Sequence, residues 1–183
     1  MGEDVRAGLL RRRLVLLDRR IDGMAANAAI AQLLLLDGQD PQAEIRVVVN
    51  AAGGELTAGL GLHDVMRRCA APVSTVCFGE AGGVAALALS GGSRGRRFMS
   101  VGARVRLELG RVERGDARVA ELTEWARELE ALTFRFARAL AEDCGRHVEE
   151  VEHDLHAGRA LDAAGAVRYG IVDAVLEGRE PLT

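Results

Sequence analysis

Two stretches with the same organisation, VVVNAAGG at residues 47–54 and TVCFGEAGG at residues 75–83, decide the fold of this chain. Each begins with a compact β-rich run typical of a buried strand. Each ends in paired glycines, which permit a tight turn. Helix-forming segments follow both stretches. Strand, glycine turn and helix repeated in this order predict an α/β fold with a largely parallel sheet.

The rest of the sequence extends this alternation. Residues 79–83 are expected to form a glycine-bearing loop between a strand and the helix that follows. The longest helix, 117–142, has apolar residues at helical spacing, and such a stripe on one isolated domain predicts self-association. The expected strands are 14–17, 45–50, 73–78, 97–100, 104–109 and 171–176, and the expected helices are 24–36, 57–69, 84–89, 117–142, 148–155 and 163–169.

Composition limits the class of protein. The chain has 183 residues, of which 49% are hydrophobic and 28% charged, which indicates one folded domain and excludes disorder. No apolar run is long enough to cross a bilayer, so we expect no membrane association. A net charge of −3 and an aromatic content of 3% argue against nucleic-acid binding. The three cysteines form no CxxC pair, which fits a reducing cytoplasm and predicts no metal site, and we expect no cofactor.

Shorter stretches join the two glycine motifs into one pattern. They are found at residues 30–34, 57–59, 95–98, 126–129 and 166–173. In this order and spacing, the chain resembles the proteolytic subunit of the Clp protease, within the wider crotonase-like fold, from about Leu9 to Leu176. The resemblance implies a single domain over residues 1–183, built as a spiral of β-β-α units. It also implies a short N-terminal tail at 1–8 and a protruding handle, a strand and a helix, at 111–142.

The family hydrolyses peptides with a Ser-His-Asp triad, and all three positions are changed in this chain. By resemblance, the nucleophile position holds Gly83, the histidine position Glu108 and the aspartate position Gly158. Glycine cannot attack a carbonyl, and loss of one triad member already costs several orders of magnitude in rate. The resemblance therefore implies a catalytically degenerate member, an inactive pseudo-peptidase.

The oxyanion hole of the family needs only backbone N–H groups. Those positions correspond here to Gly54 and Val84, so a remnant of the oxyanion hole is expected between the two glycine turns. Glu80 and Glu108 are expected beside it. There they would form either a pair of carboxylates for acid–base work or a solvated group in a pocket without function.

Two active alternatives remain open from the residues. One is a serine peptidase with a rearranged site that combines His153 or His156 with one of the serines Ser74, Ser90, Ser93 and Ser100. The other is a crotonase-like binder of acyl thioesters that uses the Gly54 and Val84 amides, with Glu108 as the base.

The resemblance also implies a quaternary role. The expected partners are further copies of this chain, in a heptamer-like ring, or an active subunit of the same family. Residues 1–8 are shorter than the family's N-terminal segment, which weakens the expectation of docking to an unfoldase ATPase. The charged segment 111–116 replaces a glycine-rich strand that meets a second ring in the family, so altered stacking of two rings is expected.

Overall fold

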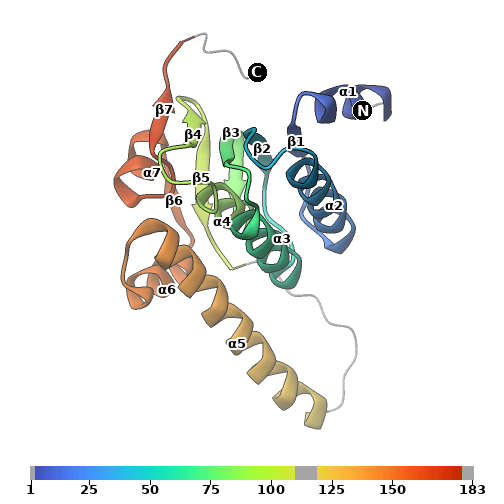
Figure 1. The fold of residues 1–183 in the computed structure, drawn as a ribbon. Coiled ribbons are helices and arrows are strands. Elements are labelled where there is room, and N and C mark those ends of the chain that lie inside the picture. The colour runs from blue at the N-terminus through green and yellow to red at the C-terminus, as the bar shows by residue number, and fades with distance from the viewer. Residues whose placement is uncertain (1–2, 110–118, 179–183) are drawn as a thin grey trace.

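A computed structural model describes residues 3–109 and 119–178, with side chains at 4–109 and 125–178. A parallel sheet runs through the middle of the molecule in the order β1-β2-β3-β4-β7, and β3 also pairs with β5 beyond the end of β4 (Figure 1). The strands are β1 (Leu14–Leu17), β2 (Ile45–Ala51), β3 (Val73–Gly82), β4 (Arg97–Ser100), β5 (Arg104–Leu107), β6 (Arg159–Leu161) and β7 (Ala174–Leu176). This architecture confirms the predicted α/β class.

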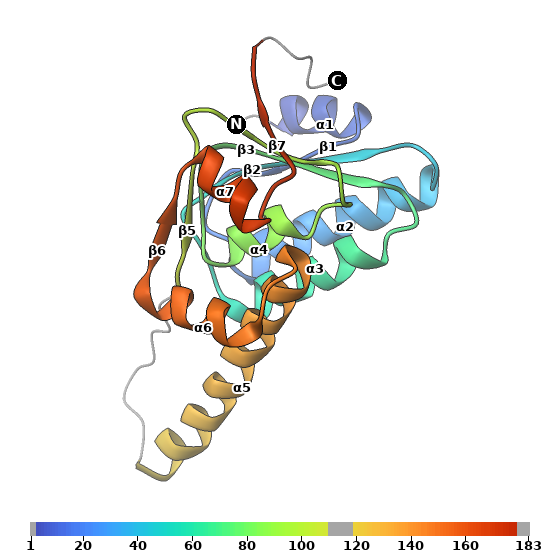
Figure 2. The ribbon, with the colours of Figure 1, turned by 90° about the vertical axis from the view of Figure 1, so that its left-hand side faces the viewer.

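Helices α2, α3 and α4 lie side by side along one face of the sheet (Figures 1 and 2). Local sequence fixes where two of the helices begin, because the Asp22 carboxylate accepts the Ala25 N–H at 2.7 Å and Asp162 caps α7 in the same way. The helices are α1 (Glu3–Arg11), α2 (Gly23–Gln39), α3 (Leu56–Arg68), α4 (Val84–Ser90), α5 (Val119–Cys144), α6 (Val148–Ala157) and α7 (Ala163–Tyr169).

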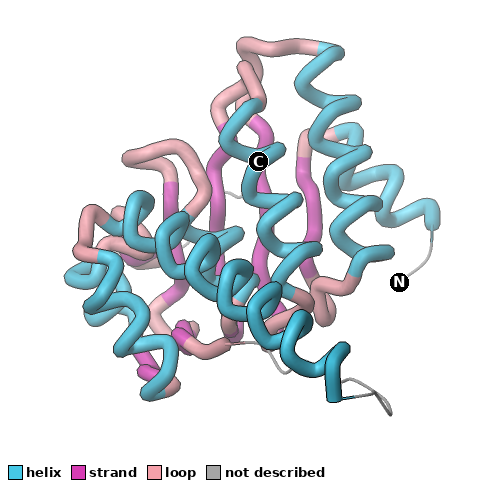
Figure 3. Tube along the Cα trace, turned by 90° about the horizontal axis from the view of Figure 1, so that it is seen from below, coloured by secondary structure: helices cyan, strands magenta, loops and turns pink. Residues whose placement is uncertain are grey.

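Helix α4 forms the centre of the core. Every residue from Val84 to Ser90 is buried, between the sheet and helices α3 and α5. Phe136 and Leu140, near the end of α5, are fully buried against the same core. The earlier turns of α5 project away from the body, and seen from below the helix crosses beneath the strands (Figures 1 and 3). Helix α5 thus lies where the handle helix was expected, whereas the handle strand expected at 111–116 lies outside the described residues.

Three expectations differ from the structure. The glycine stretch from Gly79 to Gly82 continues β3 instead of forming a loop, because residues 80–82 pair with β5. The last strand begins at Ala174 and not at 171, because Ile171 still donates to Ala166 to close α7. Of the expected N-terminal tail, residues 3–8 lie in α1. In addition, β6 was not expected, since three residues carry no periodic signal.

Arg97 joins the C-terminal elements to the sheet. Its side chain is almost fully buried in β4, and its guanidinium donates to Asp173 at 2.6 and 3.0 Å and to the carbonyl oxygens of Asp143 and Gly170 at 3.0 and 2.9 Å. Burial alone would raise the pKa of Asp173, but the hydrogen bonds from Arg97 more than offset it and hold that pKa below its usual value. Because the buried Arg97 cation donates to all these acceptors, it links the start of β4 to the C-terminal ends of α5 and α7.

We expect Asp173→Asn to lower the free energy of unfolding by about 3 kcal/mol at pH 7, because Arg97 would keep its charge while buried without its partner. The pKa of Asp173 is lower in the folded state. Its contribution is therefore complete above the unfolded pKa of about 3.9 and is lost as the pH falls further. Urea denaturation at pH 7 and pH 3 measures both effects.

The matched control is Asp18→Asn, which removes an exposed pair with Arg6 and should cost less than about 1 kcal/mol. Two results would contradict this account of Arg97. One is an equal loss of unfolding free energy in Asp173→Asn and Asp18→Asn. The other is a loss in Asp173→Asn that is as large at pH 3 as at pH 7.

Candidate functional site

Gly83 forms the whole turn between β3 and α4. Its φ of 48° and ψ of −118° lie in a region that residues with a side chain rarely adopt. A Cβ at this position would stand 3.1 Å from the carbonyl oxygen of Glu108, closer than such contacts normally are. Both the backbone conformation and the space around it therefore favour glycine over serine at this turn.

Strand β5 connects the segments that carry the three predicted triad positions. The Gly83 N–H donates to the Arg106 carbonyl of β5 at 2.9 Å. On its other side, β5 pairs antiparallel with β6, and Leu107 lies opposite Arg159. The residues that continue the two strands from this pair are Glu108 and Gly158. Residues 83, 108 and 158, which are far apart in the sequence, thus all lie on segments that border the end of β5.

Gly158 ends α6 in the left-handed conformation, with φ 65° and ψ 42°. A Cβ there would meet no atom within 4 Å, so the space is open and only the backbone conformation favours glycine. The described residues that line the neighbouring cavity do not include Gly158.

A cavity of about 280 Å³ lies between the two glycine turns. It is lined by Arg20, Ala52, Gly53, Gly54, Gly83, Glu108 and Leu109. The two turns are in backbone contact, since a Cβ on Gly82 would stand 2.3 Å from the Ala52 carbonyl oxygen. A Cβ on Gly54 would stand 2.2 Å from the Ile21 oxygen. These glycines are therefore required by close packing, whatever the chemistry of the cavity.

The two amides of the predicted oxyanion hole are placed differently. Gly54 lines the cavity, but Val84 is fully buried and is not among its lining residues. Gly59 of α3 explains the burial, because a Cβ there would stand only 2.3 Å from the Val84 Cβ. The cavity lining therefore includes the first turn and Gly83 but not the buried Val84 side chain. The acyl-thioester alternative, which depends on both amides, stays a prediction.

Only one of the two predicted carboxylates faces the cavity. Glu108 lines it, with 39% of its side chain exposed and the Arg106 guanidinium 3.8 Å away. Glu80 lies opposite Arg104 in the β3–β5 ladder and is not a lining residue. The carboxylate pair considered for acid–base work is not assembled.

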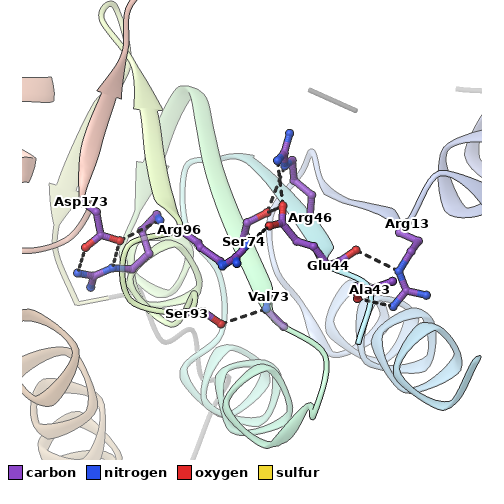
Figure 4. Close-up of polar contacts among 10 residues, drawn as sticks. Arg13, Ala43, Glu44, Arg46, Val73, Ser74, Ser93, Arg96 and Asp173 are labelled. Carbon is purple, nitrogen blue, oxygen red and sulfur yellow. Dashed lines mark hydrogen bonds and ion pairs between the residues drawn. The ribbon is translucent and has the colours of Figure 1, made fainter. Parts of the chain in front are cut away.

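The serines considered for a rearranged site serve the packing. Ser74 is buried and donates to Glu44 at 2.7 Å, in a network that also contains Arg46 and Arg96 (Figure 4). Burial alone would raise the pKa of Glu44, but these hydrogen bonds outweigh it and lower the pKa. Ser93 accepts the Val73 N–H at 3.1 Å (Figure 4).

The histidines considered for a rearranged site lie on the surface. His153 and His156 are exposed on α6, and neither lines the cavity between the glycine turns. The Nδ1 atom of His156 lies 2.7 Å from the Glu152 carbonyl oxygen of its own helix. No hydrogen bond among the described residues joins either histidine to Ser74, Ser90, Ser93 or Ser100. Ser100 is half-buried at the end of β4.

Sequence reasoning missed a buried serine, aspartate and histidine that do meet. Ser90 Oγ donates to Asp143 Oδ2 at 2.8 Å, and His63 Nε2 lies 2.8 Å from the same oxygen. The aspartate stands in the middle, so the imidazole cannot take the serine proton as a catalytic triad requires. The three side chains are more than nine-tenths buried, at the end of α4 opposite to Gly83. The sequence signal that could have revealed this cluster was His63, a polar residue on the inner face of α3. Its partners could not be recognised from the sequence, because Ser90 and Asp143 are 27 and 80 positions away.

The cysteines are no better as nucleophiles. Burial raises the pKa of the Cys77 and Cys144 thiols to about 12, so both are protonated at neutral pH. Among the described residues, no group of three histidine, cysteine, aspartate or glutamate side chains is arranged to hold a metal ion. None of the helices in the described ranges has the length and apolar character to span a bilayer.

The parallel sheet with its strand–glycine–helix turns defines an α/β protein, and the same turns carry the sequence resemblance to a family of serine peptidases. A family model for the Clp protease matches residues 2–179. The chain belongs to the Clp protease family, as the resemblance predicted.

Two curated relatives show the same similarity. The chain is 33% identical over 178 residues to "ATP-dependent Clp protease proteolytic subunit 1" of Bifidobacterium longum (strain NCC 2705), covering 97% of this chain and 76% of that protein. It is 34% identical over 173 residues to "ATP-dependent Clp protease proteolytic subunit 3, chloroplastic" of Arabidopsis thaliana, covering 94% and 56%. The chain thus spans little more than half the length of the plant relative.

We expect Gly83→Ala to lower the free energy of unfolding by about 1–3 kcal/mol, because the methyl group forces a strained backbone conformation against the Glu108 carbonyl. Gly61→Ala is the matched control. Gly61 lies inside α3 with open space around it, so the same substitution should stabilise by roughly 0.5–1 kcal/mol. Denaturant titration of both variants measures the difference, and effects of the same sign would contradict the assigned turn geometry.

Proposed function

We propose that this protein is a pseudo-peptidase of the Clp family, which keeps the fold of a proteolytic subunit and serves as a structural or regulatory ring subunit. The observation that carries the proposal is the set of residues at positions 83, 108 and 158. Glycine, glutamate and glycine stand there, in a family whose reaction uses serine, histidine and aspartate.

The chemistry of the residue set supports inactivity. Covalent peptide hydrolysis needs a nucleophile whose proton passes to an adjacent base. Gly83 has no side chain, and no hydroxyl lines the cavity among the described residues to be activated by Glu108. The nearest complete set of residue types, Ser90, Asp143 and His63, is buried and connected in the wrong order. The described residues of the cavity therefore offer no nucleophile and base for the covalent route, which supports the proposal.

A role in an assembly is supported by the apolar groove along α5. The groove, of about 760 Å³, lies between α5, α6 and Leu109, and its lining includes Leu129 and Phe134. Phe134 is 48% exposed, and exposed apolar surface of this extent is typical of an interface. A homo-oligomer, such as a heptamer-like ring, or a hetero-oligomer with an active subunit would cover it.

Purified protein is expected to leave a fluorogenic peptide uncleaved and to remain unlabelled by a serine-directed fluorophosphonate. The triple variant Gly83→Ser, Glu108→His, Gly158→Asp rebuilds the triad and should gain labelling at residue 83. The matched control carries Glu108→His and Gly158→Asp alone and should stay unlabelled. Mass spectrometry locates any adduct.

Labelling of a serine in the unmodified protein, or turnover well above the no-enzyme rate, would overturn the proposal of inactivity. A folded triple variant that stays silent would show that positions 83, 108 and 158 do not correspond to the triad.

The assembled mass tests the structural role. We expect a mass well above the 19.5 kDa of one chain, either alone or after mixing with an active subunit of the family. Phe134→Glu should reduce it, because a charge would then be buried in the interface. Val101→Glu, at an exposed apolar position in the β4–β5 turn, should not. Native mass spectrometry measures all three proteins, and a monomer under every condition would contradict the role.

A further inference from the structure

Two opposite charges line the cavity between the glycine turns without forming a pair. Arg20 follows β1 and is exposed, and its guanidinium makes no ion pair with any carboxylate of the described residues. Glu108 is the carboxylate of the same cavity, and its contact with Arg106 is long, at 3.8 Å, and solvent-exposed. Opposite charges that share a small cavity and stay apart leave room for a ligand with both charges.

The walls between the two charges are backbone. Three of the lining residues are glycines without side chains, Gly53, Gly54 and Gly83. The space that the serine and histidine side chains of an active family member would narrow therefore stays open. The cavity volume of about 280 Å³ is slightly smaller than the 300–1,000 Å³ typical of sites for drug-sized ligands. The ligand that fits such a volume is a single small molecule and not an extended chain.

We propose that this cavity binds a small zwitterion of the amino-carboxylate class, with its carboxylate on Arg20 and its ammonium group on Glu108. A guanidinium presents two parallel N–H donors to a carboxylate, which makes Arg20 the anion-recognising end. Glu108 is the cation-recognising end. A simple anion or a simple cation satisfies one end and is repelled by the other, so the site discriminates in favour of a ligand with both charges.

The inference rests on the proposed absence of peptidase chemistry, because an acyl-enzyme would occupy the same space. Glu108 is the one carboxylate among the described residues that line the cavity, and its 3.8 Å contact with Arg106 joins two partly exposed side chains. Binding is expected to be weak and salt-sensitive, since both charges are partly hydrated.

The probes are L-alanine, N-acetyl-L-alanine, L-alaninamide and L-alanyl-L-alanine, tested on the full chain in its natural assembly. Saturation-transfer NMR detects binding whatever the size of the assembly, and calorimetry gives Kd. We expect L-alanine to bind at least tenfold more tightly than either its acetylated or its amidated form. The dipeptide arm shows whether the site takes a free amino acid or a short peptide end.

Two variants locate the charges. Arg20→Gln should weaken L-alanine binding at least tenfold while leaving L-alaninamide unchanged, and Glu108→Gln should remove the preference for a free amine. Their matched controls are Arg19→Gln and Glu80→Gln, exposed neighbours that do not line this cavity and should leave Kd unchanged.

Absence of saturation transfer from L-alanine at millimolar concentration would overturn the inference, as would binding that ignores acetylation, amidation or both cavity variants. L-Alanine, the probe that decides the outcome, has no amide bond to hydrolyse. A failure here therefore leaves the fluorophosphonate result unaffected, and labelling of the protein would overturn the proposed function independently of amino-acid binding.

Discussion

The pairing of β3 with β5 is the constraint on which the candidate site depends. β3 continues for several residues beyond the part that pairs with β4, and residues 80–82 bond to β5 there. This pairing sets Gly83 against the Glu108 carbonyl. Because β5 also pairs with β6, the same strand brings the end of α6 to the site. Without β5, residues 83, 108 and 158 would belong to separate parts of the molecule.

Close backbone packing is a sufficient reason for the glycines of both turns. Gly54 and Gly82 each approach a carbonyl oxygen so closely that a Cβ would overlap it. These turns are thus required by the fold itself. Replacing either glycine would lower the stability of the protein, whatever the chemistry of the cavity.

A network of buried polar contacts away from the candidate site fixes the C-terminal end of α5, the handle helix. The Asp143 carboxylate is shared by Ser90 and His63, and its carbonyl accepts from Arg97. These contacts join α3, α4, α5 and β4 at the end of α4 opposite to Gly83. A serine, a histidine and an acid can therefore meet in a protein core for packing alone, and their order of contact separates that role from catalysis.

The sequence by itself determined the α/β class, the position of most helices and strands, and the identity of the residues at positions 83, 108 and 158. Hydrophobic periodicity and glycine turns are local signals that can be read from short stretches of sequence. The residue types at positions 83, 108 and 158 are likewise known from the sequence and do not depend on the fold. Only the tertiary structure decided that Gly79–Gly82 is strand, that Val84 is fully buried and that Arg20 and Glu108 line the same cavity. These features depend on which distant segments pair and pack, and neither β5 pairing nor the contact between Gly59 and Val84 is encoded in any short stretch of the chain.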